Sequence, residues 1–197
     1  MHSPSQTHLG AAKRALRYIR GTTDYGLWFS KNESEKLEGY ADSDWAGSSD
    51  DAKSTSGYVF SLGSGVFSWN SKKQDVVAQS SAEAEYISAA AAANQAIWLR
   101  KILSDIGHVQ ESASVIWVDN KSAIAIAKNP VQHGRTKHIK VKFHALREAE
   151  KAKEINLKYC RTEDQVADVM TKALTKRKFE TLRSKLGVLK KNLKEEC

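Results

Sequence analysis

The sequence predicts an α/β fold, a five-stranded mixed sheet with helices on both faces. In the main part of the chain three candidate strands come first, and Gly63-Ser64-Gly65 separates the second from the third, as is typical of a hairpin. Further along the chain, candidate helices alternate with two more candidate strands. Three antiparallel strands followed by strands that alternate with helices imply a mixed sheet.

Composition narrows the class of protein. The 197 residues suffice for one compact domain with extensions, and Lys plus Arg exceed Asp plus Glu by 31 to 23. The net charge of +8 slightly favours a polyanionic partner such as nucleic acid over a merely basic protein. No apolar run reaches the ~20 residues that cross a membrane, and the chain does not begin with a signal peptide. Cys160 and Cys197 form no Cys-x-x-Cys pair, so we expect a reduced, intracellular protein without a disulfide framework.

Five segments are expected to form the strands of the main sheet. The fourth of them is a short continuous apolar run, which is typical of a strand buried on both faces. These strands are predicted at residues 37–42, 57–62, 66–70, 115–118 and 154–160. A further strand at 24–30 and a helix at 8–20 precede the polar turn 31–36, which is the best candidate boundary before the main domain.

Four helices are predicted within or after this sheet. The first is long and begins at a capping box, with Ser80 as N-cap and Glu83 three residues later. Its apolar stripe is expected to consist of Ile87, Ala91, Trp98 and Ile102. The second and third helices follow at 122–128 and 136–152. Thr162 and Gln165 form another capping box, which predicts a final helix to about residue 186. The last ten residues read as a Lys-rich tail.

Four acidic residues fall at the ends of these elements, and they are Asp42, Glu85, Asp119 and Asp168. The first and fourth strands can be central neighbours in a mixed sheet, so their ends and two helix starts could meet at one edge. Each acid also has a purely structural interpretation, as a turn residue, a helix cap or a solvated charge. Asp44 is an alternative to Asp42, whereas the capping box already accounts for Glu83.

Clustered carboxylates repel one another, and divalent cations remove that repulsion. Oxygen ligands suit Mg²⁺, with Mn²⁺ as a possible substitute. Two such ions about 3.5–4 Å apart can activate a water and stabilise the leaving oxygen of a phosphodiester. The sequence therefore suggests a phosphodiesterase that needs no nucleophilic side chain.

Six ordered blocks of sequence resemble the ribonuclease H domain of copia-type retrotransposons. They are GYADSDWAG (39–47), KSTSGYVF (53–60), SSAEAEY (80–86), VDNKSAIAIAKNP (118–130), RTKHIKVKFHALRE (135–148) and TEDQVADVMTK (162–172). The resemblance implies a ribonuclease H fold, with Asp42, Glu85, Asp119 and Asp168 as the catalytic, metal-binding carboxylates. It also implies hydrolysis of the RNA strand of an RNA/DNA hybrid during reverse transcription.

The same resemblance divides the chain into three parts. Residues 1–34 are similar to the end of a reverse transcriptase, residues 35–176 to the ribonuclease H domain, and residues 177–197 form a basic helix end and tail. The polymerase catalytic motif is missing, so we expect no DNA synthesis. A reverse transcriptase domain of the same polyprotein is the implied partner, and cytoplasmic virus-like particles are the implied location.

One feature departs from the wider ribonuclease H family. Many members carry a histidine in the loop before the last helix, whereas this loop reads Cys160-Arg161-Thr162-Glu163. The absence of this histidine affects the expected rate of turnover more than it affects the expected metal site. A non-catalytic nucleic-acid-binding remnant therefore stays open as an alternative. A transposase or integrase is disfavoured, because those enzymes place the helix glutamate after the second aspartate, and Glu85 precedes Asp119.

Two groups of residues are candidates for substrate contacts. Basic residues around the third helix could bind phosphates without reading sequence, although an ordinary solvated face is an equal alternative. Short polar side chains near the carboxylates could contact the 2′-hydroxyl groups of RNA. The candidates are Arg135, Lys137 and Lys140 for the first group, and Ser80, Ser81, Asn120 and Ser122 for the second.

Overall fold

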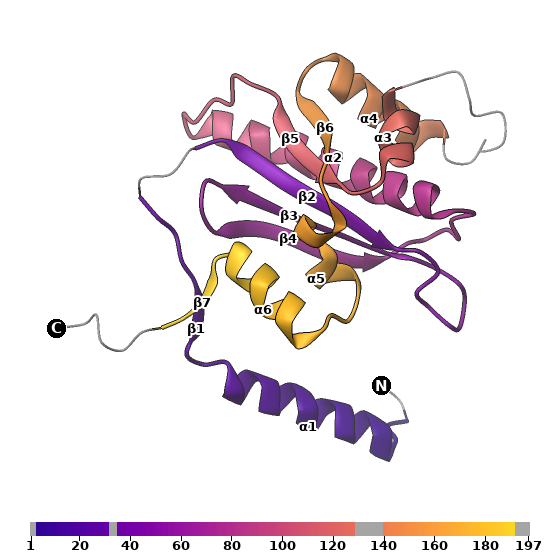
Figure 1. The fold of residues 1–197 in the computed structure, drawn as a ribbon, viewed down its shortest axis with the longest axis vertical. Coiled ribbons are helices and arrows are strands. Elements are labelled where there is room, and N and C mark those ends of the chain that lie inside the picture. The colour runs from indigo at the N-terminus through magenta and orange to yellow at the C-terminus, as the bar shows by residue number, and fades with distance from the viewer. Residues whose placement is uncertain (1–2, 32–34, 129–139, 192–197) are drawn as a thin grey trace.

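The computed structural model describes residues 3–31, 35–128 and 140–191 (Figure 1). Its centre is a five-stranded sheet in the order β4-β3-β2-β5-β6. The strands are β2 (Leu37–Asp44), β3 (Thr55–Leu62), β4 (Val66–Lys73), β5 (Ser114–Val118) and β6 (Ile155–Tyr159). β2, β3 and β4 pair antiparallel, whereas β5 runs parallel to both β2 and β6. The predicted mixed sheet is confirmed, and β2 and β5 are the central neighbours expected.

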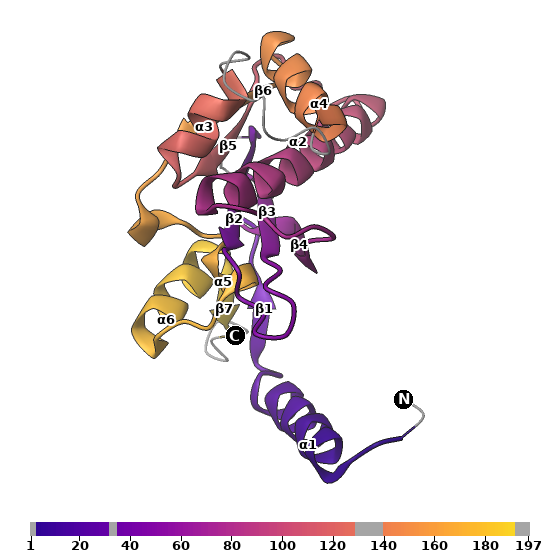
Figure 2. The ribbon, with the colours of Figure 1, turned by 90° about the vertical axis from the view of Figure 1, so that its right-hand side faces the viewer.

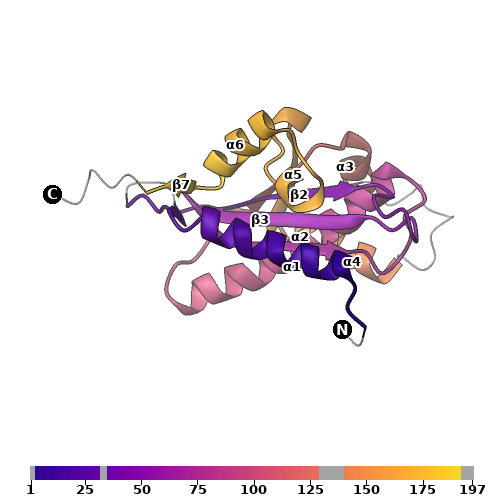
Figure 3. The same cartoon turned by 90° about the horizontal axis from the view of Figure 1, so that it is seen from below.

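Helices cover both faces of this sheet (Figures 2 and 3). One face is covered by α2 (Ser81–Asp105), α3 (Lys121–Lys128) and α4 (Lys140–Lys151), which share a hydrophobic core with the strands. The other face carries α5 (Asp168–Thr171) and α6 (Lys176–Lys185) over a smaller cluster. Among the described helices, none combines the length and the apolar character that a bilayer span requires.

The face of α2 that packs on the sheet differs from the predicted stripe. Trp98 is 55% exposed and Ile102 37%, Ala91 is exposed, and Ile87 is only partly buried. The buried side consists mostly of small residues, which are Ala89, Ala92, Ala93 and Ala96. Small side chains let α2 lie close to the strands. The alanine face therefore packs on the sheet, and the larger apolar residues of the predicted stripe do not.

The predicted continuous helix from 162 to 186 is wrong. The segment forms a 3₁₀ turn, Thr162–Asp164, followed by the separate helices α5 and α6. Gln165 explains the interruption, because its side chain is fully buried instead of capping a helix. Its Nε2 donates to the Ala41 carbonyl at 2.9 Å, and its Oε1 accepts from the Ala167 N–H at 3.2 Å.

A strand that precedes the main sheet and one near the end of the described chain form a separate two-stranded sheet. β1 (Tyr25–Leu27) pairs antiparallel with β7 (Val188–Lys190), and β7 lies in the segment predicted as a Lys-rich tail. Gly187 permits this path with a φ of +79°, and a Cβ there would lie 2.8 Å from the Gly65 Cα. Before β1, the predicted first helix forms α1 (Gln6–Gly21), of which no residue is buried. The division at residues 34 and 176 stays a prediction.

Candidate metal centre

Three carboxylates from three elements converge near the carboxyl ends of β2 and β5. Asp42 belongs to β2, Asp119 directly follows β5, and Glu85 lies in the second turn of α2. One oxygen of each side chain lies within 4.8 Å of an oxygen of the other two. Because β2 and β5 are parallel neighbours, both strands deliver their acidic residue to the same end of the sheet.

The two alternative acids have structural partners outside this cluster. Asp44 accepts a hydrogen bond from the backbone N–H of Thr55 in the neighbouring strand. Glu83 accepts from the Gln79 N–H at 2.8 Å, and its own N–H donates to the Ser80 Oγ at 3.2 Å. Both acids thus stabilise local backbone.

Burial and like charge act together on the cluster. Burial, together with the charges of Asp42 and Asp119, raises the pKa of Glu85 to about 9. Burial also raises the pKa of Asp42, against the lowering effects of Thr171 and Lys172. Glu85 Oε1 accepts from the Ser43 N–H at 3.1 Å, whereas its buried Oε2 has no hydrogen-bond partner among the described residues. Glu85 therefore has no ion-pair partner among the described residues, and the charge of Lys172 opposes only part of the rise in its pKa.

Asp168 lies beside this cluster and is compensated differently. It is fully buried, and its two oxygens form ion pairs with Lys172, at 2.7 Å, and with Lys178. Lys172 Nζ also lies 3.4 Å from Asp42 Oδ2, and the Thr171 hydroxyl donates to that same oxygen. The structure thus joins Asp168 to Asp42 through a lysine, while the closest grouping of carboxylates contains the other three acids.

Sequence reasoning assigned no role to Thr171, Lys172 or Lys178. Lys172 follows Asp168 by four residues, which is the spacing at which opposite charges pair on a helix, so a local signal existed. Lys178 comes from the next helix, and no local pattern pointed to Asp168. Ser88 was also missed, although it is buried and donates to the Asp42 carbonyl at 2.6 Å.

Comparison with known proteins shows that the chain is similar to proteins of transposons. No family model matches it. Over 190 residues it is 40% identical to the retrovirus-related Pol polyprotein from transposon RE2 of Arabidopsis thaliana, covering 96% of this chain. Over 188 residues, which are 95% of this chain, it is 38% identical to the retrovirus-related Pol polyprotein from transposon TNT 1-94 of Nicotiana tabacum. Over nearly its whole length, the chain is therefore homologous to a part of the retrovirus-related Pol polyproteins of transposons. It spans only 13% and 14% of the lengths of these two relatives.

The chain has the ribonuclease H fold. The structure of LC11-RNase H1, isolated from compost, superposes with a TM-score of 0.50 and 15% sequence identity. The superposition covers 70% of this chain and 93% of that protein. The fold expected from the sequence blocks is therefore confirmed.

The predicted substrate residues that the structure describes lie at helix starts. Ser80 and Ser81 begin α2, and Ser122 lies exposed in the first turn of α3. Asn120 Oδ1 accepts from the Ala123 N–H at 3.1 Å, so Asn120 provides the cap of α3 that Asp119 could have supplied. Three basic candidates are not located, because Arg135 and Lys137 lie outside the described residues and only the backbone of Lys140 is described, at the start of α4.

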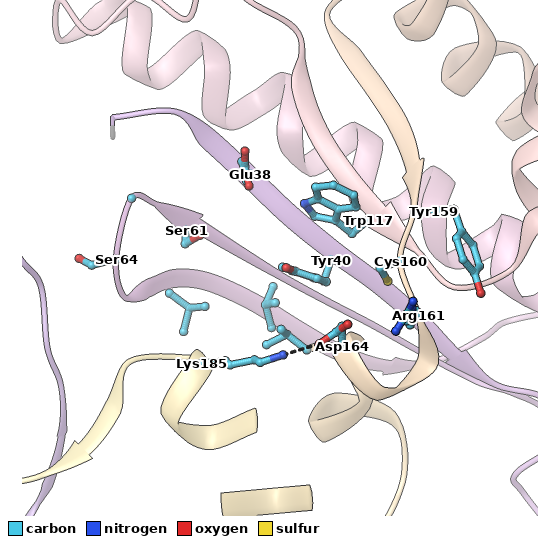
Figure 4. Close-up of a pocket in the computed structure, with 14 residues that line it drawn as sticks. Glu38, Tyr40, Ser61, Ser64, Trp117, Tyr159, Cys160, Arg161, Asp164 and Lys185 are labelled. Atoms are coloured by element: carbon cyan, nitrogen blue, oxygen red, sulfur yellow. Dashed lines mark hydrogen bonds and ion pairs between the residues drawn. The ribbon is translucent and has the colours of Figure 1, made fainter. Parts of the chain in front are cut away.

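A cavity of about 620 Å³ lies on the sheet face that carries α6 (Figure 4). Tyr40 and Trp117 stack in its wall with ring centroids 6.4 Å apart, and the Asp164–Lys185 ion pair lies at its rim. Trp117 is only partly buried, so the prediction that its strand is buried on both faces is wrong. Since side chains alternate along a strand, Tyr40 and Trp117 share a face with Asp42 and Asp119, two residues along. The cavity is adjacent to the carboxylate cluster and separate from it.

Proposed function

We propose that this segment is a ribonuclease H that hydrolyses the RNA strand of RNA/DNA hybrids with the help of divalent cations. The observation that carries the proposal is the convergence of Asp42, Glu85 and Asp119 within a ribonuclease H fold. These carboxylates are mostly buried, and burying like charges together is costly unless a cation compensates them. If the three carboxylates had only structural roles, nothing would favour placing them together.

The residues present fit a hard cation. The donor set is made of carboxylate oxygens, which Mg²⁺ and Mn²⁺ prefer, and it includes no histidine or cysteine. The buried Glu85 Oε2, without a hydrogen-bond partner among the described residues, is an oxygen that a cation would satisfy. Its elevated pKa also points to a missing positive charge. We therefore assign Asp42, Glu85 and Asp119 as the ligands, with Asp168 as a fourth acid nearby.

The surrounding residues would hold these ligands in position. The Ser43 N–H orients Glu85, and the Thr171 hydroxyl orients Asp42. A bound divalent cation would lower the pKa of a water molecule and stabilise negative charge on the phosphodiester oxygens. No serine or cysteine nucleophile is required, and Cys160 is buried with a pKa raised by burial to about 12.

Substrate recognition would use the rim of the site and the basic character of the chain. The net charge of +8 supports salt-sensitive attraction to phosphates. Asn120 directly follows Asp119, and Ser122 is exposed one turn along, so both are candidates for contacts to the RNA 2′-hydroxyl. The polyprotein relatives support a reverse transcriptase of the same polyprotein as partner, and a role in reverse transcription.

A panel of labelled duplexes tests this function. The purified chain should cut RNA paired with DNA in Mg²⁺ and leave RNA/RNA, DNA/DNA and single-stranded RNA intact. A contaminating nuclease that uses the RNA 2′-hydroxyl would leave cyclic phosphate ends, whereas attack by water leaves none. Hybrid binding without cleavage at any Mg²⁺ or Mn²⁺ concentration would instead indicate a non-catalytic nucleic-acid-binding remnant.

A further inference from the structure

Asp168 is the most deeply buried acid at the centre, and two lysines face it. Its relative exposure is 0%, and Lys172 and Lys178 each pair with one of its oxygens. An unpaired carboxylate buried to this extent would be strongly unfavourable. The two ammonium groups therefore compensate the buried carboxylate of Asp168 in the absence of any metal.

The two lysines reach Asp168 from different elements. Lys172 ends α5 in an extended conformation, four residues after Asp168. Lys178 comes from the first turn of α6, where the Thr175 hydroxyl accepts from its N–H at 3.4 Å. Only Lys172 also approaches Asp42, because its Nζ lies 3.4 Å from Asp42 Oδ2. Lys172 thus bridges the two acids, whereas Lys178 pairs with Asp168 and donates to the Thr162 carbonyl at 3.2 Å.

The positive charge is distributed unevenly over the four acids. Lys172 and Lys178 compensate Asp168 and part of Asp42, while Glu85 has no ion-pair partner among the described residues. The side of the site at Glu85 and Asp119 is thus open to a divalent cation. The side at Asp42 and Asp168 already holds the ammonium group of Lys172.

We propose that Lys172 is a resident cation that competes with a divalent ion for the carboxylates of Asp42 and Asp168. The inference rests on the proposed metal-dependent function and adds a regulation of its metal occupancy. One ion binds at Asp42, Glu85 and Asp119, and a second binds between Asp42 and Asp168 only after Lys172 has moved away. Lys172 is able to move, because its side chain is 37% exposed and carries its charge on a flexible stem.

Calorimetric titration of the metal-free chain with Mg²⁺ and with Mn²⁺, without nucleic acid, tests this competition. Lys172→Met keeps the length of the side chain and removes its charge. We expect it to tighten the weaker of two binding steps at least tenfold and to lower the melting temperature in EDTA. Lys172→Arg keeps the positive charge, so its second binding step should stay as weak as in wild type. If the methionine variant fails to fold, the arginine variant still tests whether a cation at this position keeps the second step weak.

Two further variants act as controls. Lys178→Met removes a partner of Asp168 but leaves Lys172 in place, so it should destabilise the metal-free chain and tighten the second step less than Lys172→Met. Lys185→Met breaks only the exposed pair with Asp164, so ion binding should not change. If the wild type binds ions and Lys172→Met binds the second no more tightly, the competition is refuted while the proposed function stands. If no variant binds an ion, the metal site of the proposed function fails as well.

Discussion

The backbone N–H of Ser43 donates a hydrogen bond of 3.1 Å to Glu85 Oε1. This contact ties the second turn of α2 to β2, one residue beyond Asp42. It fixes one oxygen of Glu85 and leaves the other buried without a hydrogen-bond partner among the described residues. Glu85 is therefore held ready for a ligand at some cost to the metal-free fold.

Replacing Glu85 should reveal that cost. Glu85→Gln keeps the acceptor for the Ser43 N–H and removes the buried acid, so we expect the metal-free chain to gain about 1–3 kcal/mol of unfolding free energy at pH 7. Hybrid cleavage should be lost at the same time. Urea unfolding in EDTA measures the gain in unfolding free energy. Glu83→Gln, two residues earlier in α2, is the matched control. A destabilised Glu85→Gln chain would show that the carboxylate is not under strain.

The pH dependence of stability follows from the same residue. The folded chain keeps the Glu85 proton up to a pKa of about 9, whereas the unfolded chain releases it near the ordinary glutamate pKa of 4.5. The unfolded state thus binds fewer protons in this range, so metal-free stability falls as pH rises, by at most about 1.4 kcal/mol per unit. Unfolding midpoints in EDTA between pH 5 and 8.5 should decline more steeply for wild type than for Glu85→Gln. If the unfolding midpoints of wild type and Glu85→Gln declined equally with pH, Glu85 would not be the cause of the pH dependence.

Gly57 is expected to control how closely α5 approaches the sheet. A Cβ at this position would lie 2.7 Å from both Met170 Cβ and Thr171 Cγ2. Gly57→Ala should push α5 away from β3, cost about 1–3 kcal/mol and slow hybrid cleavage, because Thr171 positions Asp42. Gly10→Ala in α1 is the control, since nothing lies within 4 Å of its Cβ position. Equal stability and activity of Gly57→Ala and wild type would show that α5 adjusts without consequence.

Ser88 satisfies two backbone carbonyls beneath the metal centre. Its hydroxyl donates to the Asp42 carbonyl at 2.6 Å and lies 3.3 Å from that of Gly57. Ser88→Ala leaves these buried acceptors without their donor, so we expect a loss of about 1–3 kcal/mol in chemical unfolding. Ser104→Ala, on the exposed side of the same helix, should stay within about 0.5 kcal/mol of wild type. Similar unfolding free energies for Ser88→Ala and Ser104→Ala would show that Ser88 does not stabilise the site.

The sequence allowed the neighbourhood of Asp42 and Asp119 to be predicted for a clear reason. The order of strands and helices required a mixed sheet, and β2 and β5 as parallel neighbours bring both residues to the same end. Glu85 followed from the capping signal at Ser80, which fixed where α2 begins. Local patterns and topology rules were sufficient for these three positions.

Other features depended on tertiary contacts that no local pattern encodes. α2 packs through alanines because of the closeness of the sheet, which the hydrophobic stripe through Trp98 did not indicate. The final helix is interrupted because Gln165 binds the Ala41 carbonyl, a contact across 124 residues. The pairing of Lys178 with Asp168 likewise joins two separate helices.

The central claim is that the carboxylate cluster cuts RNA in a hybrid. Cleavage of a hybrid labelled on both strands should be compared for wild type and Asp119→Asn in Mg²⁺, with hybrid binding and unfolding measured on both chains. We predict that wild type cuts only the RNA strand and stops in EDTA, while the folded Asp119→Asn chain binds the hybrid without cutting it. Cleavage by Asp119→Asn at the wild-type rate, or by wild type in EDTA, would contradict the account.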